Sequence, residues 1–278
     1  METATSTSHN MIGALVGDIV GSVYEFNNIK SKDFVLFSSK CTVTDDSVMT
    51  IATADWILGG DEPALSYAHW GYKYPHAGYG PSFSEWIRMA TLYGYAPSYN
   101  SCGNGSAMRV SPVGWAFNSE SEILEYARYS AVCTHDHPEG IKGAQAIAMG
   151  VYMARTGAPK DEIRQYMERQ FGYDLSFTLD GIRPTYGWHS EFGNGVLCQA
   201  SVPQAIVAFL EGEDFEDCIR GAISIGGDSD TIGCMTGAIA GAFYGIPEDI
   251  IRKAEQFIPQ DMRSVMDQFI HKYIPQSI

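Results

Sequence analysis

The chain has 278 residues, of which 45% are hydrophobic, and its 33 acidic and 18 basic side chains give a formal net charge of −15. This length suits one large domain with a substantial core. A chain so negative repels phosphate backbones, which argues against nucleic acid as a partner, and clustered acids would repel one another unless cations lie between them.

The N-terminal residues predict a short tail without a targeting segment. Residues 1–10 have no basic region ahead of an apolar run, so we expect no signal peptide. The apolar run 11–23 is too short to span a bilayer and contains Asp18, so we expect no membrane association. The six cysteines form no C-x-x-C pair, which indicates reduced thiols in a cytoplasmic protein. We therefore expect a disordered tail at 1–10 and a single domain at 11–278.

Helical periodicity dominates the rest of the chain. The expected helices are, in chain order, 11–25, 46–58, 83–92, 120–132, 139–155, 160–170, 201–211, 214–225, 231–244, 247–257 and 260–272. Alternation typical of a strand occurs only at 33–37, and the Tyr-, Gly- and Pro-rich stretch 71–105 is expected to be ordered loop around one short helix. The pattern predicts an all-α domain.

Two of the expected helices carry glycine at every fourth position. These glycines are Gly13, Gly17, Gly21, Gly233, Gly237, Gly241 and Gly245. A glycine inside a helix costs about 0.5–1 kcal/mol relative to alanine. Small residues at this spacing allow helix backbones to approach closely. We therefore expect 11–24 and 232–244 to cross at the centre of the domain and to contact each other.

An acidic cluster precedes the second of these helices, in the sequence GGDSDT at 226–231. If the helix begins at Thr231, Asp228 and Asp230 lie in the preceding loop and are free to converge. Two carboxylates and a hydroxyl supply half of the octahedral oxygen shell that Mg²⁺ or Mn²⁺ prefers. The alternative is an ordinary helix cap with spare charge.

A second acidic cluster, Thr44, Asp45 and Asp46, opens the expected helix 46–58. Capping that helix requires one of these side chains, not all three, and adjacent like charges destabilise a fold unless they are neutralised. Taken alone this cluster favours a cap. Taken with the cluster at 226–231, it predicts a divalent metal site.

Asp18 and Glu25 are separated by seven residues, so they share one face if 11–25 is a single helix. Asp18 lies among apolar and small residues, and a buried carboxylate must be paired, protonated or metal-bound. Holding neighbouring groups by hydrogen bonds and direct ligation of a metal remain alternatives for Asp18. We expect Glu25 to end the helix and to reach into a cleft as a base or a ligand.

Two polar loops are candidates for ligand contacts. Gly103-Asn104-Gly105 could expose successive N–H groups as an anion nest, or form a plain turn, and the nearby Arg109 could bind phosphate or pair with a carboxylate. The His-x-His pair at 135 and 137 has no further His or Cys at a spacing that supports zinc. A hydrogen-bonding role near a substrate is therefore expected for His135, with a solvated position in a loop as the alternative.

With these motifs in place, the chain closely resembles the ADP-ribosylglycohydrolase family, which includes the dinitrogenase-reductase-activating glycohydrolase and the ADP-ribosyl-acceptor hydrolases of animals. The resemblance extends through most of the sequence in five blocks, at 13–26, 44–50, 103–114, 134–144 and 201–245. The last block is the most specific, because it combines a helix, Gly-Gly-Asp-x-Asp-Thr and a helix with regularly spaced glycines.

The resemblance implies an all-α orthogonal helical bundle with two Mg²⁺ or Mn²⁺ ions at the base of a central cleft. The metal-binding positions it implies are Thr44, Asp45, Asp46, Asp228, Asp230, Thr231 and Glu25. The positions it implies for contacts with ADP-ribose are Gly103, Asn104, Gly105, Ala107, Met108 and His135. Either Glu25 or Asp45 would act as the catalytic base.

The implied activity is metal-dependent hydrolysis of the glycosidic bond between ADP-ribose and an arginine or serine side chain. The substrate would be an ADP-ribosylated protein or another ADP-ribose derivative, and we expect the enzyme to be a monomer. Release of ADP-ribose from O-acetyl-ADP-ribose or from poly(ADP-ribose), two-metal phosphoesterase chemistry and a non-catalytic crystallin-like role are alternatives. Crystallin-like relatives lose acidic ligands, whereas all six principal ligand positions are filled here, which favours catalysis.

Overall fold

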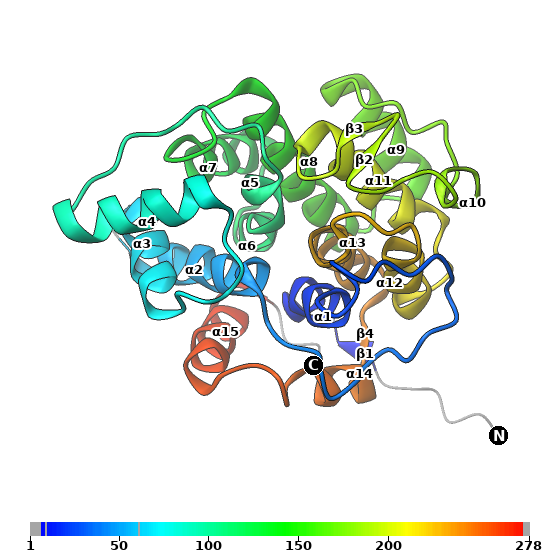
Figure 1. Ribbon diagram of the computed structural model, residues 1–278, viewed down its shortest axis with the longest axis horizontal. Coiled ribbons are helices and arrows are strands. Elements are labelled where there is room, and N and C mark those ends of the chain that lie inside the picture. The colour runs from blue at the N-terminus through cyan, green and yellow to red at the C-terminus, as the bar shows by residue number, and fades with distance from the viewer. Residues whose placement is uncertain (1–6, 9, 61, 275–278) are drawn as a thin grey trace.

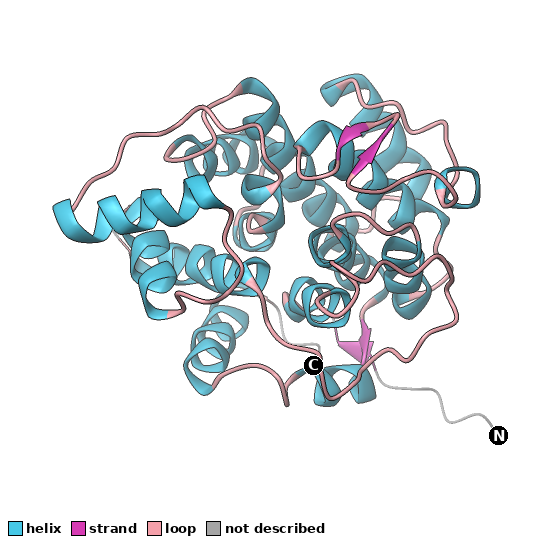
Figure 2. Cartoon of the chain, in the orientation of Figure 1, coloured by secondary structure: helices cyan, strands magenta, loops and turns pink. Residues whose placement is uncertain are grey.

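The computed structural model describes residues 7–8, 10–60 and 62–274. Helices make up most of this part of the chain (Figures 1 and 2). In chain order they are α1 (Ile12–Gly21), α2 (Asp45–Gly59), α3 (Pro63–Lys73), α4 (Pro81–Tyr93), α5 (Gly105–Met108), α6 (Ser111–Ala116), α7 (Glu120–Val132), α8 (Pro138–Arg155), α9 (Lys160–Phe171), α10 (Leu179–Ile182), α11 (Cys198–Glu211), α12 (Phe215–Ser224), α13 (Ser229–Tyr244), α14 (Glu248–Ala254) and α15 (Gln260–Tyr273).

The helices form an all-α orthogonal bundle, as the sequence predicts. Helix α13 lies at its centre and packs against α1, α8, α11 and α12. Figure 1 looks nearly along α1 and α13, whereas α2 and α4 run across the view. The residues of α13 from its first turn to Ala242 are buried, so this helix is the axis around which the others assemble. Among the described helices, no segment combines the length and apolar character of a bilayer span.

Strands are limited to two short antiparallel pairs in the described residues (Figure 2). Strand β1 (Thr7–Ser8) pairs with β4 (Ile246–Pro247), and β2 (His189–Ser190) pairs with β3 (Gly193–Asn194). Strand β1 falls within the expected disordered tail 1–10, so residues 7 and 8 of that tail are ordered. Residues 1–6 and 9 lie outside the described part of the chain. The expected strand at 33–37 is wrong, because this segment has no regular structure.

The first helix is shorter than expected. Helix α1 ends at Gly21, where the Ser22 hydroxyl donates a hydrogen bond to the Ile19 carbonyl at 2.9 Å and closes the last turn. The expected helix 11–25 is therefore wrong beyond residue 21. The sequence also missed α3, α5, α6 and α10. The last three of these have 4, 6 and 4 residues, too few to show a clear helical period.

Helices α1 and α13 meet backbone to backbone along their glycines. A Cβ atom added at Gly17 would stand 1.9 Å from the carbonyl oxygen of Gly233, and one at Gly13 would stand 2.3 Å from that of Gly237. No side chain, not even the methyl group of alanine, fits at such distances. The predicted contact between the two glycine-bearing helices is confirmed.

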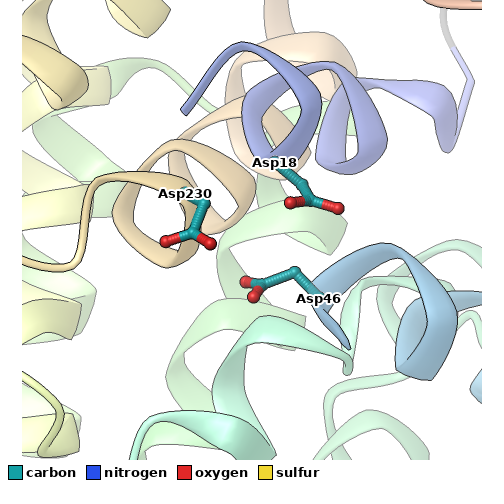
Figure 3. A group of neighbouring side chains, drawn as sticks. All are labelled: Asp18, Asp46 and Asp230. Atoms are coloured by element: carbon teal, nitrogen blue, oxygen red, sulfur yellow. The ribbon is translucent and has the colours of Figure 1, made fainter. Parts of the chain in front are cut away.

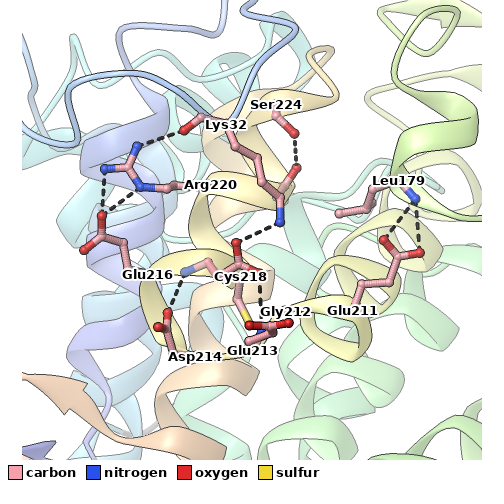
Figure 4. A network of polar contacts seen from close by, with 12 residues as sticks. Lys32, Leu179, Glu211, Gly212, Glu213, Asp214, Glu216, Cys218, Arg220 and Ser224 are labelled. Carbon is pink, nitrogen blue, oxygen red and sulfur yellow. Dashed lines mark hydrogen bonds and ion pairs between the residues drawn. The ribbon is translucent and has the colours of Figure 1, made fainter.

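The irregular segment that connects α1 to α2 is held against α12 by charged side chains (Figure 4). Arg220 on α12 pairs with Glu216 at 2.7 Å and donates hydrogen bonds to the carbonyl oxygens of Lys32 and Phe34, at 2.9 and 2.7 Å. Lys32 in turn pairs with Asp217 at 2.8 Å. The bond to Phe34 satisfies a carbonyl group that a strand at 33–37 would have paired within a sheet.

The α1–α13 contact generates a stability prediction. We expect Gly17→Ala to lower the free energy of unfolding by about 3 kcal/mol or more, because its new methyl group overlaps backbone atoms that cannot rotate away. Gly59→Ala at the end of α2 is the matched control, since a Cβ there meets nothing within 4 Å. Urea unfolding followed by circular dichroism measures both variants. Equal stability of the two would contradict the close backbone contact.

Candidate metal centre

A cleft of about 640 Å³ opens where the N-terminal ends of α2 and α13 face each other. Eleven of the residues expected in a site line it, namely Glu25, Asp45, Asp46, Gly103, Asn104, Gly105, Met108, His135, Asp228, Asp230 and Thr231. Two others lie just behind its wall: Thr44 is buried at the start of α2, and Ala107 is fully buried within α5. Segments far apart in the sequence thus converge on one cavity.

The start of α2 is fixed by Asp18 from α1. Asp18 Oδ2 accepts hydrogen bonds from the backbone N–H groups of Thr44 and Ser47, at 2.9 and 3.0 Å, and from the Ser47 hydroxyl. Its Oδ1 accepts from the Thr44 hydroxyl at 2.7 Å. Thr44 also caps α2 by accepting from the Asp46 N–H, which leaves the carboxylates of Asp45 and Asp46 free for other partners. Asp18 therefore acts as a hydrogen-bonded support for this helix end.

The start of α13 is shaped by two glycines with positive φ, +76° at Gly226 and +73° at Gly227. They turn the chain sharply so that Asp228 stands at the N-cap position, where its side chain makes no capping hydrogen bond. Instead, Asp228 Oδ2 accepts from Asn104 Nδ2 at 2.8 Å. Asp230 lies in the first turn of α13 rather than in the preceding loop, which corrects the expected helix start. An ordinary helix cap therefore does not explain why an aspartate stands at position 228.

Five carboxylates gather between these helix ends, and we call Asp18, Glu25, Asp46, Asp228 and Asp230 the carboxylate cluster. One oxygen from each of Asp18, Asp46 and Asp230 lies within 4.8 Å of the others, and the same holds for Glu25, Asp228 and Asp230. Figure 3 shows the first of these triads, whose side chains come from α1, α2 and α13 and point toward one another. Asp230 belongs to both triads.

The carboxylate cluster is electrostatically unfavourable as it stands. Burial, reinforced by the neighbouring carboxylates, raises the pKa of Asp46 and Asp230 well above the ordinary value, and burial raises that of Asp18 as well. Burial, together with Asp228 and Asp18, raises the pKa of Glu25 to about 7. Among the described residues, no lysine or arginine forms an ion pair with these carboxylates.

The donor set fits a hard divalent cation. Asp46 Oδ1 is buried and has no hydrogen-bond partner among the described residues, although its Oδ2 accepts from the Thr231 hydroxyl at 3.2 Å. A buried carboxylate oxygen without a donor is costly unless positive charge faces it. Two triads of oxygen ligands with a shared aspartate meet the preference of Mg²⁺ and Mn²⁺ for carboxylate oxygens. Acidic residues therefore cluster where they can hold metal.

Glu25 is positioned by a turn rather than by a helix, so the expectation that it shares a helix face with Asp18 is wrong. Its carbonyl oxygen accepts from Asn28 Nδ2 at 2.9 Å and from Trp188 Nε1 at 3.3 Å. Asn28 also pairs with both polar groups of the Gly227 peptide: its Oδ1 accepts from the N–H at 2.8 Å, and its Nδ2 donates to the carbonyl at 2.9 Å. Asn28 thus connects the Glu25 turn to the loop that carries Asp228.

The Gly-Asn-Gly segment does not form an anion nest, because Gly103 makes an isolated antiparallel bridge with Leu197 and Gly105 begins α5. The Gly103 N–H already donates to Ser101 Oγ at 3.1 Å, and the Asn104 N–H donates to the Val196 carbonyl at 2.8 Å. Neither Gly103 nor Gly105 has a positive φ. A Cβ at Gly105 would stand 3.1 Å from His135 Nε2, so glycine keeps this wall of the cleft open beside the imidazole.

His135 lines the cleft as a neutral imidazole, because burial holds its pKa well below the ordinary value. Its Nδ1 lies 2.7 Å from the Thr134 hydroxyl, and this hydroxyl accepts a hydrogen bond from Arg109 at 2.9 Å. We infer that the Thr134 hydroxyl donates a hydrogen bond to His135 Nδ1. The imidazole proton is then on Nε2, which can act as an N–H donor. Arg109 binds Thr134, the Ser130 carbonyl and the Tyr67 ring, and forms no ion pair with a described carboxylate.

The sequence did not identify the aromatic walls of the cleft, which are formed by Phe26, Phe83, Tyr99 and Trp188. Phe26 is 80% exposed and stacks on Trp188 with ring centroids 6.0 Å apart. Irregular segments carry three of these side chains, where no periodic pattern marks them. The aromatic content of 71–105 was the only signal for Phe83 and Tyr99, and nothing in the sequence marked Trp188 or Asn28.

Comparisons with known proteins agree with this geometry. The family model for ADP-ribosylglycohydrolase matches residues 9–277. ADP-ribosylhydrolase ARH3 of Mus musculus is 29% identical over 96% of this chain and 91% of its own length, and that of Homo sapiens is 28% identical over 96% and 93%. The ADP-ribosyl-[dinitrogen reductase] glycohydrolase of Rhodospirillum rubrum is 25% identical over 61% of this chain and 56% of its own length.

A solved structure described as an ADP-ribosylglycohydrolase-related protein complex has the same fold. It superimposes with a TM-score of 0.68 at 25% sequence identity, and the match covers 95% of this chain and 96% of that one. The likeness thus extends over nearly the whole bundle.

The raised pKa values predict how stability depends on pH when metal is removed. The pKa of Glu25 rises from 4.5 to about 7 on folding, so the folded chelated protein binds more protons than the unfolded chain between these values. The free energy of unfolding of the chelated protein therefore falls as the pH rises through this window. We expect a lower melting temperature at about pH 8 than at about pH 5.5 in EDTA, and a smaller difference in excess Mg²⁺. A chelated protein that is equally stable at both pH values would contradict the repulsion described above.

Proposed function

Because the chain belongs to the ADP-ribosylglycohydrolase family and is therefore a glycosyl-bond hydrolase, we propose that it releases ADP-ribose from modified arginine or serine side chains in a metal-dependent reaction. The observation that carries the proposal is the pair of carboxylate triads sharing Asp230 beside a cleft of about 640 Å³. Such a cleft lies within the range of small-molecule sites, roughly 300–1,000 Å³.

We assign two Mg²⁺ or Mn²⁺ ions to the cluster. The ligands would come from Thr44, Asp45, Asp46, Asp228, Asp230, Thr231 and Glu25, with Asp18 as a further carboxylate in contact with the site. Divalent cations supply positive charge that orients sugar hydroxyls and acidifies water. The hydrogen bonds from Asn104 to Asp228 and from Thr231 to Asp46 keep these carboxylates in a fixed orientation toward the ions.

Glu25 is our first candidate for the catalytic base. Hydrolysis at the anomeric carbon passes through an oxocarbenium-like transition state and requires proton removal from the attacking water. The Glu25 carboxylate lines the cleft beside Asp228 and Asp230, where it could take that proton from a water molecule. Asp45 is the second candidate, because it also lines the cleft and burial raises its pKa well above the ordinary value.

The remaining cleft residues would bind the ADP-ribose portion. His135 presents a neutral Nε2–H donor beside Gly103 and Gly105, whose missing side chains leave room for the ligand. Asn104 and Met108 complete this wall, and Ala107 supports it from behind. Because the protein is strongly negative, the metal ions must supply the attraction for the pyrophosphate.

An acceptor panel tests the activity. Purified protein with Mg²⁺ is incubated with peptides ADP-ribosylated on arginine or on serine, and the products are separated by chromatography. We expect free ADP-ribose from one of the two peptides and none in the presence of EDTA. Release of AMP would favour phosphoesterase chemistry instead, and ADP-ribose release that persists in chelator would contradict the role of the metal.

Asp228→Asn tests the cluster itself. The substitution removes one of the three carboxylates in the triad of Glu25, Asp228 and Asp230. We expect it to lower metal affinity and turnover about 100-fold, while circular dichroism still reports a helical fold. Asp267→Asn on the exposed face of α15 removes the same charge far from the cleft and should leave both unchanged. Equal activity of the two variants would remove Asp228 from the site.

Asn28→Ala tests how Glu25 is positioned. The substitution removes the bonds from Asn28 to the Glu25 carbonyl and to the Gly227 peptide, so we expect kcat to fall about tenfold or more with a smaller change in KM. The neighbouring Asn27→Ala is the control, since Asn27 is exposed and makes no side-chain hydrogen bond within the described chain. A change in KM alone would indicate that Asn28 serves binding rather than chemistry.

A further inference from the structure

A second cavity of about 500 Å³ lies outside the cleft. It is formed by the first turn and a half of α8, the first half of α11, the segment 172–177 and Phe192 in the β2–β3 hairpin. None of its lining residues also lines the cleft. The proposed hydrolase reaction does not use this cavity, and its polar groups have no assigned role.

Four buried polar atoms of its lining residues have no hydrogen-bond partner among the described residues. They are both ends of the Gln204 amide, the Tyr173 hydroxyl and one carboxylate oxygen, Glu139 Oε2. Gln204 is fully buried and Tyr173 is 6% exposed, so bulk water does not replace the missing partners. Buried donors and acceptors are nearly always paired in folded proteins. Three unsatisfied side chains around one cavity therefore indicate a ligand that satisfies them together.

The backbone of α11 is irregular at the same place. Pro203 lies inside α11 and has no N–H, so the Gln199 carbonyl lacks the donor that residue i+4 supplies in a regular helix. Both residues line the second cavity. Pro203 thus interrupts the regular hydrogen-bond pattern of α11 one residue before the unpaired Gln204 amide.

The opposite wall is aromatic. Phe177 and Phe192 are partly exposed, and their ring centroids lie 5.3 Å apart at an interplanar angle of 57°. Lys142 pairs with Glu139 Oε1 at 2.8 Å and lies 4.9 Å from the centre of the Tyr173 ring, so it is already neutralised. Glu139, Asp174 and Lys142 are the charged residues of the lining, two acids and one base, which leaves a formal charge of −1.

From these features we propose that the second cavity binds an amine-bearing nucleobase, presented as an uncharged nucleoside. A glutamine amide with both ends free matches the adjacent N–H donor and ring-nitrogen acceptor of such a base. Glu139 Oε2 accepts the second N–H of the exocyclic amine, and the phenylalanines supply a surface on which a flat ring stacks. The net negative lining repels a phosphate group, which sets this site apart from one for nucleotides.

Isothermal titration calorimetry with adenosine tests the proposal, and it measures binding without any dependence on turnover. We expect adenosine to bind at least tenfold more tightly than uridine, which lacks an exocyclic amine, and than AMP, which adds negative charge. We expect Gln204→Leu to weaken adenosine binding at least tenfold. The free variant should melt no lower than the parent, because Gln204 has no protein partner to lose.

Gln145→Leu on α8 is the matched control, because this glutamine donates to the Leu124 carbonyl at 2.9 Å and lies outside the cavity lining. It should lower the melting temperature and leave adenosine binding unchanged. Tyr173→Phe removes a single hydroxyl and is expected to weaken binding even if Gln204→Leu fails to fold. Adenosine binding that is equal in the parent, Gln204→Leu and Tyr173→Phe would overturn the proposal, as would no binding to the parent at millimolar adenosine.

Discussion

The backbone contact between α1 and α13 is the constraint on which the site depends. Gly21 ends α1 directly against the first turn of α13, where an added Cβ would stand 2.4 Å from the Cα of Asp230. Asp18 lies one turn earlier on α1, so the same glycines that bring the helices together also bring Asp18 beside Asp230. A pair of helices packed through ordinary side chains, with axes about 8–10 Å apart, would separate these carboxylates. The glycines therefore serve the site as much as the core.

Gathering five carboxylates in a buried space opposes folding, and hydrogen bonds to two of them offset part of this repulsion. Asp18 and Asp228 receive hydrogen bonds from Thr44, Ser47 and Asn104, and these bonds hold down pKa values that burial alone would raise further. Asp46 and Asp230 receive less of this support, and their pKa values are raised well above the ordinary value. The carboxylates with the fewest protein donors are the ones best suited to bind cations.

The sequence predicted those features of the fold that depend on local patterns. Long amphipathic helices, the glycine spacing of α1 and α13, and the hydroxyl-carboxylate clusters at two helix starts are all local, and each is present in the structure. The errors concern places where distant residues decide the outcome. The segment 33–37 alternates like a strand, yet the Phe34 carbonyl accepts a hydrogen bond from Arg220. Among the described residues, no strand lies beside this segment to pair with it.

The division between helix ends and irregular segments also separates two aspects of the function. Helix ends carry the carboxylate cluster, so the type of chemistry is encoded in short motifs such as 44–46 and 226–231. The aromatic walls of the cleft come mainly from turns and loops, where Phe26 stacks on Trp188 and Asn28 bonds to the Glu25 turn. Loops tolerate substitution without disturbing the helices that carry the carboxylate cluster. Substitutions in these loops would therefore alter the walls of the cleft and leave the carboxylate cluster in place.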